Sequence, residues 1–141
     1  MNKTAMPTQV TEALKLTKNN SATRMDGCLY ELWKTLNQHH LKRSKLNKMS
    51  FNIIKTLTTI FRDIQTHGVE EGTPFTLRWM CPIYKKKDHT EISNYRPITL
   101  LNTDYKLLTK VLAIQLIENI KNMVHLDQAG FIPNCNILNH I

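Results

Sequence analysis

Apolar residues recur at three- and four-residue steps in four stretches of the chain, the spacing of one face of an α-helix. The predicted helices are Thr8–Lys18, Cys28–Gln38, Lys45–Thr66 and a fourth from Asn102 or Thr103 to between Met123 and His125. The third has the strongest pattern, with Ser44 as its expected N-cap and Gly68 as its stop. The fourth is expected to bury a stripe of Leu108, Leu112, Leu116 and Ile120.

Two short stretches between the third and fourth helices have an extended rather than a helical pattern. Phe75–Tyr84 and Tyr95–Leu101 are rich in aromatic and β-branched residues, and the polar segment Lys85–Ser93 connects them. Pro82 cannot donate to a strand ladder, so we expect an edge or a bulge there. The predicted fold class is α+β, helix-rich with a short antiparallel β-hairpin.

Composition narrows the class of protein. The 141 residues carry 41% apolar residues, enough for one small core, and a formal charge of +8. Such a charge favours a polyanionic partner, nucleic acid or an anionic membrane surface, although solvated lysines are the simpler alternative. Three cysteines (Cys28, Cys81 and Cys135) form neither a disulfide framework nor a zinc signature, which favours reduced thiols in an intracellular protein. The sequence does not distinguish a nuclear from a cytoplasmic location. No apolar run reaches membrane-spanning length, so no membrane partner is expected.

Catalytic and metal-binding patterns are absent from the sequence. Two-metal chemistry needs clustered carboxylates, and Glu70-Glu71, beside Gly72, has the pattern of a solvated loop. The histidines do not have metal-ligand spacing, and there is no phosphate-binding glycine loop. We therefore predict no catalytic residue and no metal site in this chain.

The hairpin is the remaining candidate site. Lys85, Lys86 and Lys87 end the first extended segment, and Arg96 opens the second. If the segments pair antiparallel, Lys85 and Arg96 converge on one anion, such as a triphosphate or a backbone phosphate. Tyr84 and Tyr95 beside them can stack on bases. Charge pattern alone favours the alternative of a solvated hairpin tip.

Several separate short motifs of the sequence resemble those of one protein family. CPIYKKKD, ISNYRPITLLNTDYKLLTKVLAIQL and DQAGFIPN, in this order, resemble motifs of LINE-type (non-LTR retrotransposon) reverse transcriptases, and Asp26-Gly27 with YELWK resembles the segment before them. The resemblance covers Thr8–Ile141. It implies the fingers region of a right-hand polymerase. Residues 8–141 would form a partial reverse transcriptase domain, truncated before the catalytic palm, after a disordered N-terminus at residues 1–7.

The resemblance also implies site residues and partners. Lys85 and Arg96 would bind the triphosphate of the incoming nucleotide, and Gln128, Gly130 and Phe131 would shape the template and nucleotide pocket. Further phosphate contacts are expected from Lys86, Lys87, Tyr84 and Tyr95. The implied partners are RNA, an RNA–DNA hybrid and a deoxynucleoside triphosphate. Mg²⁺ is expected only in the complete family enzyme, because the metal-binding aspartates of the family lie beyond this chain.

Two departures from the family pattern affect this interpretation. Asn134-Cys135 replaces the usual Gly-Arg, and Thr23-Arg24-Met25 replaces a Pro-Gly-Pro pattern. We therefore expect a piece of an RNA-directed DNA polymerase that contributes nucleotide and template binding and is inactive alone. A basic nucleic-acid-binding module and a non-functional relic of a transposable element remain as alternatives. The sequence does not determine the oligomeric state.

Overall fold

The computed structural model describes residues 4–21 and 26–120, with side chains as far as Glu118. Its elements, in chain order, are α1 (Pro7–Lys15), α2 (Tyr30–Lys45), α3 (Ile53–His67), the 3₁₀ turn η1 (Pro74–Thr76), β1 (Arg78–Tyr84), the 3₁₀ turn η2 (Ile92–Asn94), β2 (Tyr95–Leu101) and α4 (Thr103–Ile120). Four α-helices and one antiparallel pair of strands in the described part confirm the predicted α+β class.

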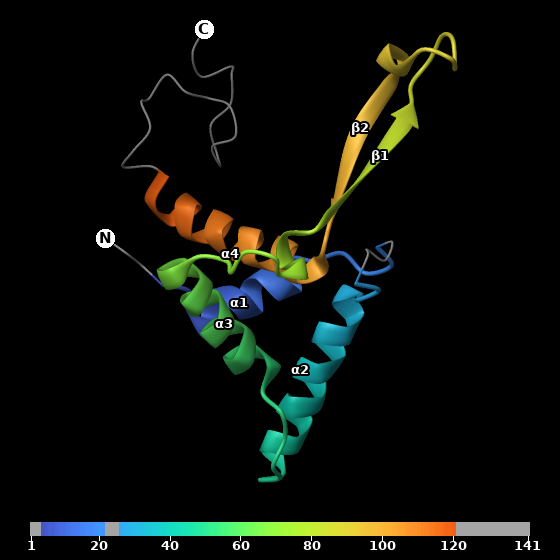
Figure 1. Cartoon of the computed structure of the whole chain (residues 1–141). Helices are drawn as coiled ribbons and strands as arrows, with labels where there is room; N and C mark the ends of the chain where they lie inside the picture. Colours follow the sequence, from blue (N-terminus) through green and yellow to red (C-terminus); the bar gives the residue numbers. More distant parts are fainter. Residues whose placement is uncertain (1–3, 22–25, 121–141) are drawn as a thin grey trace, which may run out of the picture.

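The helical body is built around α1, which contacts the other three helices (Figure 1). Pro7 begins α1, where its missing N–H costs no hydrogen bond. The Oε1 of Gln9 then accepts the Met6 N–H at 3.1 Å. Because one short helix packs against three partners, the core lies along α1. The fully or nearly buried apolar residues are Ala5, Val10, Ala13, Leu14, Ile53, Ile54, Leu57, Phe61, Leu107, Leu108 and Val111.

The predicted helix over Lys45–Thr66 is wrong at its beginning. Lys45 is the last residue of α2, and α3 begins eight residues later, at Ile53. Asn52 rather than Ser44 caps α3, since its Oδ1 accepts the Lys55 N–H at 3.0 Å. Gly68 ends α3 as predicted: it has a φ of 83°, which disfavours other residues, and its N–H donates to the Ile64 carbonyl.

Helix α2 is longer than its sequence predicted and is only partly covered. It extends to Lys45 rather than Gln38, and none of its side chains is fully buried. Trp33 and Leu36 pack on the core from one side, and the indole Nε1 of Trp33 donates to the Thr103 hydroxyl at 3.3 Å. Leu32 of the same helix is exposed. This helix therefore packs against the core along only part of its length.

Helix α4 buries a different stripe from the predicted one. Leu107, Leu108, Val111 and Gln115 face the core. Leu112 and Leu116 remain 41% and 54% exposed. Ile120, the last member of the predicted stripe, has a side chain outside the described ones. The helix is apolar around most of its circumference, so spacing alone did not identify the covered side.

A chain of side-chain amides joins α1, α3 and α4 inside the body. The Nε2 of Gln65 donates to Gln115 Oε1 at 3.1 Å, and Gln115 Nε2 donates to Gln9 Oε1 at 3.1 Å. Gln9 Nε2 then donates to Glu118 Oε1 at 3.2 Å. Buried amides are costly unless they are paired, so these bonds favour one arrangement of the three helices over others.

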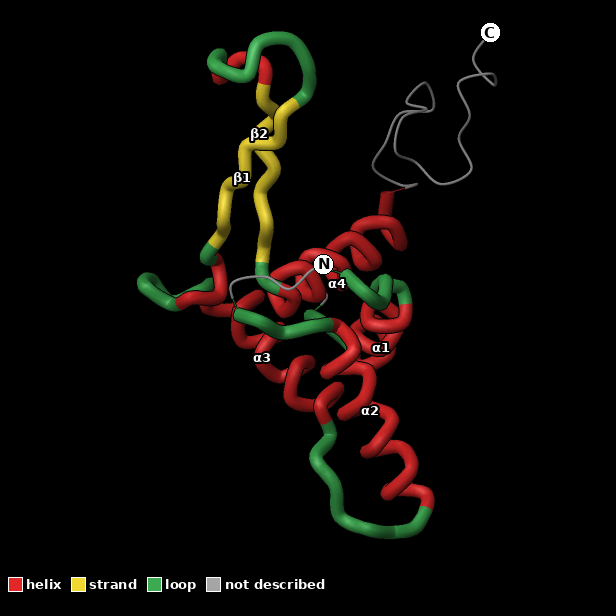
Figure 2. Tube along the Cα trace, turned by 90° about the vertical axis from the view of Figure 1, so that its right-hand side faces the viewer, coloured by secondary structure: helices red, strands yellow, loops and turns green. Residues whose placement is uncertain are grey.

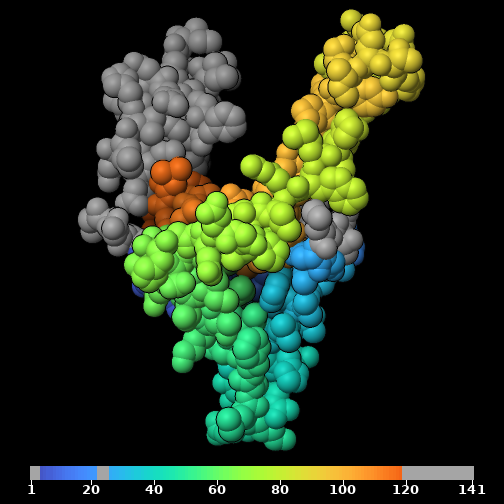
Figure 3. Space-filling model, in the orientation of Figure 1, coloured from blue at the N-terminus to red at the C-terminus, as the bar shows by residue number. Residues whose placement is uncertain are grey.

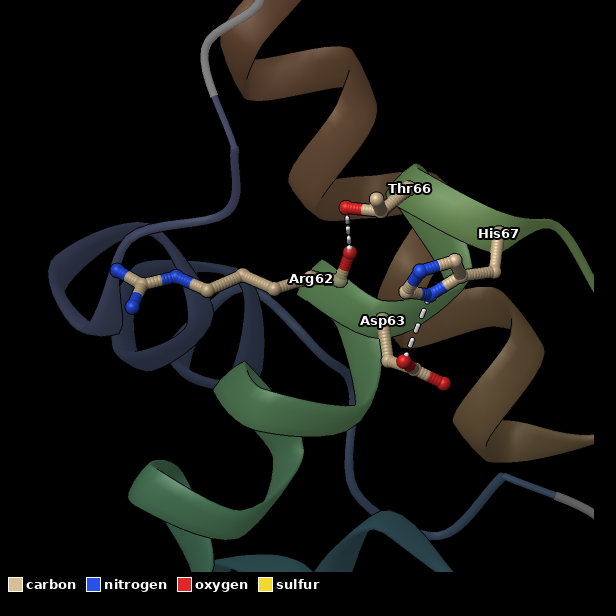
Figure 4. Close-up of polar contacts among 4 residues, drawn as sticks. All are labelled: Arg62, Asp63, Thr66 and His67. Carbon is tan, nitrogen blue, oxygen red and sulfur yellow. Dashed lines mark hydrogen bonds and ion pairs between the residues drawn. The ribbon is translucent and has the colours of Figure 1, made fainter.

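Ala5, which falls within the N-terminal segment predicted at residues 1–7, is held against α3. Ala5 is fully buried, and its N–H donates to Gln65 Oε1 at 2.6 Å. Its carbonyl accepts from Arg62 Nε at 2.6 Å. Figure 4 shows Arg62 directed away from the Asp63–His67 pair, whose atoms are 2.9 Å apart, and toward the beginning of the chain. Residues 1–3 lie outside the described part.

The hairpin of β1 and β2 projects from the helical body (Figures 1 and 2). It leaves the body at η1 and returns at the start of α4, where Asn102 Nδ2 donates to the Pro74 carbonyl at 3.1 Å. Figure 3 shows its distal end standing clear of the helices. None of the helices in the described part is long and apolar enough to cross a membrane.

Candidate nucleotide-binding hairpin

The two strands pair in a regular antiparallel register. Arg78 lies opposite Leu101 at the base and Tyr84 lies opposite Tyr95 near the tip, with one-to-one pairing between them. The Lys85 N–H donates to the Asn94 carbonyl at 2.9 Å and extends the ladder by one pair. The predicted second strand is confirmed at both ends, whereas the first begins at Arg78 because Pro74–Thr76 form the turn η1.

Pro82 and Pro97 face each other in the middle of the hairpin. Hydrogen-bonded and non-hydrogen-bonded pairs alternate along an antiparallel ladder, and the Lys85–Asn94 pair is hydrogen-bonded. The Pro82–Pro97 pair is therefore a non-hydrogen-bonded one, in which backbone N–H groups point away from the partner strand. Neither proline breaks the ladder, and each removes one donor from an outer edge. This confirms the predicted edge position of Pro82 and shows no bulge.

The register places Lys85 and Arg96 on the same face of the hairpin. Arg96 lies opposite Ile83, and Lys85 follows Ile83 by two residues, so all three side chains leave the same side of the sheet. Such diagonal neighbours have α-carbons about 7–8 Å apart. Two long cationic side chains at this separation can reach one phosphate group. The expected convergence is thus compatible with the backbone geometry.

Neither cation is neutralised by a neighbour. The side chains of Lys85, Lys86, Lys87 and Arg96 are exposed, and none makes a hydrogen bond or ion pair with another described residue. Lys87 has a φ of 78°, which turns the chain at the start of the loop. The hairpin therefore presents unpaired positive charge at its distal end.

Both tyrosines are engaged within the tip. The Tyr84 ring stacks on His89 with centroids 3.7 Å apart and meets the Tyr95 ring edge-on at 5.6 Å. The Tyr84 hydroxyl donates to the Lys87 carbonyl at 2.5 Å, and the Tyr95 hydroxyl donates to the His89 carbonyl at 2.9 Å. These contacts give both residues a part in shaping the loop. Both side chains leave the face of the hairpin opposite to Lys85 and Arg96, and base stacking by them stays a prediction.

Asp88 organises the loop, a part that the sequence reasoning missed. Its Oδ1 accepts the Thr90 N–H at 2.9 Å and the Thr90 hydroxyl at 2.8 Å, and these bonds lower the pKa of the exposed Asp88 carboxyl. Its carbonyl accepts from Asn94 Nδ2 at 2.8 Å. An aspartate two residues before a threonine is a signal for such a turn. The loop is therefore a folded structure that holds Lys85 and Arg96 in register.

The face that carries Lys85 and Arg96 continues toward the helical body as an apolar surface. Trp79 and Ile83 of β1 and Ile98 of β2 alternate in phase with Lys85 and Arg96 and share their face. Trp79 remains 58% exposed. Along this face the surface thus changes from an aromatic and aliphatic part near the body to a basic part at the tip.

The other predicted site features lie elsewhere. Gln128, Gly130 and Phe131 fall outside the described residues. Within residues 4–21 and 26–120, no group of three histidine, cysteine or acidic side chains could hold a metal ion. A pocket of about 400 Å³ lies among α1, α2 and α3, lined by residues that include Asn37, His40 and Lys55. None of the predicted site residues within the described part lines this pocket, and the four cations at the distal end of the hairpin are exposed on its surface.

Comparison with known proteins indicates the origin of the sequence. None of the protein families compared matches the chain. The chain is 25% identical over 136 residues to the Transposon TX1 uncharacterized 149 kDa protein of Xenopus laevis. The match covers 94% of this chain and 9% of that protein, so the chain spans a small part of the length of its relative. The chain is therefore related in sequence to a protein encoded by a transposable element.

Proposed function

We propose that this chain is the fingers part of a LINE-type reverse transcriptase, and that its hairpin holds the triphosphate of an incoming nucleotide. The observation that carries the proposal is the placement of Lys85 and Arg96 on one face at the distal end of the hairpin. Two of the motifs that carry the resemblance, CPIYKKKD and ISNYRPITLLNTDYKLLTKVLAIQL, lie on this hairpin and on α4 after it. Similarity to a transposon protein supports the same origin.

The chemistry fits a phosphate ligand. Arginine presents a planar pair of donors to two phosphate oxygens, and lysine adds a mobile point charge. Both charges are unpaired within the described part, so no internal ion pair has to break before the ligand binds. Cations placed at a triphosphate also stabilise the negative charge that develops on the leaving pyrophosphate.

The described residues do not supply the carboxylates of a polymerase metal centre. No cluster among them has the donors for Mg²⁺, which prefers oxygen ligands. The proposed part of this chain in the reaction is therefore to bind and orient the triphosphate.

The test is an NMR titration of the whole chain with a deoxynucleoside triphosphate. Two charge-assisted contacts at an exposed site correspond to a dissociation constant of about 1 mM, or about −4 kcal/mol. We expect Lys85→Gln with Arg96→Gln to abolish saturable binding. A matched control, Lys18→Gln with Arg78→Gln, removes the same charges away from the tip and should retain binding, because Lys18 follows α1 and Arg78 lies at the base of β1.

Both double variants must keep the helical content and the antiparallel hairpin of the unmodified chain. Equal affinity of the two variants, with the fold intact, would contradict the assigned clamp. Loss of binding in the tip variant alone would support it.

A further inference from the structure

The positive charge of this protein is concentrated away from the hairpin. The sequence from Leu32 to Arg62 contains seven lysines and arginines and no acidic residue, so it contributes +7 to the formal charge of +8. The hairpin itself, residues 78–101, contains five basic and two acidic residues and contributes +3. The main electrostatic feature is therefore the pair of helices α2 and α3 and their connection.

Three of these seven cations have internal partners. Lys34 Nζ donates to the Thr17 carbonyl at 2.7 Å, and Arg62 Nε donates to the Ala5 carbonyl at 2.6 Å. Arg43 Nε donates to the Met49 carbonyl at 3.0 Å and so orders the connecting loop. The four others are exposed and have no hydrogen bond or ion pair with a described residue. They are Lys42, Lys45, Lys48 and Lys55, and we call them the basic arm.

The basic arm runs from the end of α2 through the connecting loop to the start of α3. Lys42 and Lys45 lie in the last turn of α2, Lys48 lies in the connecting loop, and Lys55 lies in the first turn of α3. Figures 1 and 2 show the end of α2 and the loop after it pointing away from the hairpin. The basic arm and the hairpin tip are thus separate positive surfaces.

Helix stability does not account for all of the basic arm. A cation in the last turn of a helix is favoured by the helix dipole, which explains Lys42 and Lys45. Lys55 lies in the first turn of α3, where the dipole disfavours a positive charge, and Lys48 is in no helix. Four unpaired like charges also repel one another. The arrangement is therefore suited to an external polyanion.

We propose that the basic arm binds the phosphate backbone of nucleic acid, at a site separate from the nucleotide-binding hairpin. A repeated phosphate chain can meet charges on two helices and a loop at once, and each contact releases counterions. An anionic membrane is a poorer fit, because an interfacial helix needs one continuous apolar face. The exposed Leu32 and Leu41 of α2 are nine residues apart, which places them about 180° apart around the helix.

The chain offers closely matched lysine pairs for a test. Lys45 is the last residue of α2 and Lys48 follows it by three; Lys15 is the last residue of α1 and Lys18 follows it by three. All four side chains are exposed. Lys45→Gln with Lys48→Gln therefore changes charge and helix-end context as Lys15→Gln with Lys18→Gln does, but only the first pair lies in the basic arm.

The measurement is the affinity of the whole chain for an RNA oligonucleotide over a series of salt concentrations. Each phosphate contact contributes about 0.7–0.9 to the slope of log affinity against log salt. We expect the arm variant to lose about 1.4–1.8 from this slope and at least tenfold in affinity near 0.1 M salt. The Lys15 and Lys18 control should keep the slope of the unmodified chain. A second arm variant, Lys42→Gln with Lys55→Gln, should repeat the loss.

Three outcomes would overturn the proposal. They are equal slopes for the arm and control variants, an affinity independent of salt, and binding to phosphatidylserine vesicles with none to RNA. Deoxynucleoside triphosphate binding should be unchanged in the arm variants, because the hairpin keeps Lys85 and Arg96. A failure of the basic arm is thereby distinguished from a failure of the proposed nucleotide site.

Discussion

Replacing Leu107 and Leu112 separately by alanine tests which side of α4 is covered. Leu107 is fully buried, whereas Leu112 is 41% exposed. Leucine to alanine removes three carbon atoms, worth about 0.8 kcal/mol each when buried, or about 2.4 kcal/mol in total. A residual cavity raises the cost at Leu107 to about 3–4 kcal/mol. At Leu112 the same three carbon atoms are removed, but only about three fifths of their surface is buried. The expected loss of unfolding free energy is therefore about 1.4 kcal/mol, and no closed cavity forms.

Urea denaturation followed by circular dichroism measures this difference. With a slope of about 1–3 kcal/mol per molar, a gap of about 2 kcal/mol separates the two midpoints by about 1 M. The substitutions are chemically identical and lie on one helix, so the change in helix propensity is the same for both and cancels in the comparison. Equal losses, or a greater loss for Leu112→Ala, would refute the assignment of the buried stripe to Leu107, Leu108 and Val111.

The other predictions concern a helix cap and two carboxyl groups. Asn52→Ala should cost about 1 kcal/mol of unfolding free energy by removing the N-cap of α3, whereas Ser44→Ala should stay within about 0.5 kcal/mol; equal effects in urea denaturation would contradict the observed helix start. Burial raises the pKa of Asp104, so the folded state binds its proton more tightly and stability falls as pH rises from the unfolded to the folded pKa. Asp104→Asn should remove that fall in denaturation curves recorded across the acid range; an unchanged pH profile would oppose the explanation. Asp88 should titrate below an ordinary aspartate by NMR, and Thr90→Val, which removes the hydroxyl donor and keeps the backbone N–H, should shift its pKa part of the way upward; no shift would show that the Thr90 hydroxyl does not contribute.

Local sequence determined the hairpin and the ends of several elements. The strand Tyr95–Leu101, the polar tip and the stop at Gly68 were all predicted, because strand alternation, turn residues and a glycine with positive φ act over a few neighbours. The placement of Lys85 and Arg96 on one face also follows from sequence once the register is known, since side chains alternate with a period of two. The roles of Gln128, Gly130 and Phe131 stay predictions.

The division between α2 and α3 needed the tertiary structure. Apolar spacing continues through Leu46 and Met49, yet both side chains are exposed in the connecting loop. The spacing of apolar residues does not show whether another part of the chain is close enough to cover them. The chain turns at Lys45 because α3 can then pack against α1, and a helix of uninterrupted length would carry that surface away from the core.

Contacts between distant residues were likewise decided only by the tertiary structure. The amide chain from Gln65 through Gln115 and Gln9 to Glu118 joins residues that are 50 to 109 positions apart in sequence. A glutamine has the same local preferences whether its partner is water or another buried amide. The covered side of α4 was equally undetermined, because a helix that is apolar on several sides can bury any of them. Sequence thus specified the elements that depend on near neighbours, and packing around α1 selected which faces those elements bury.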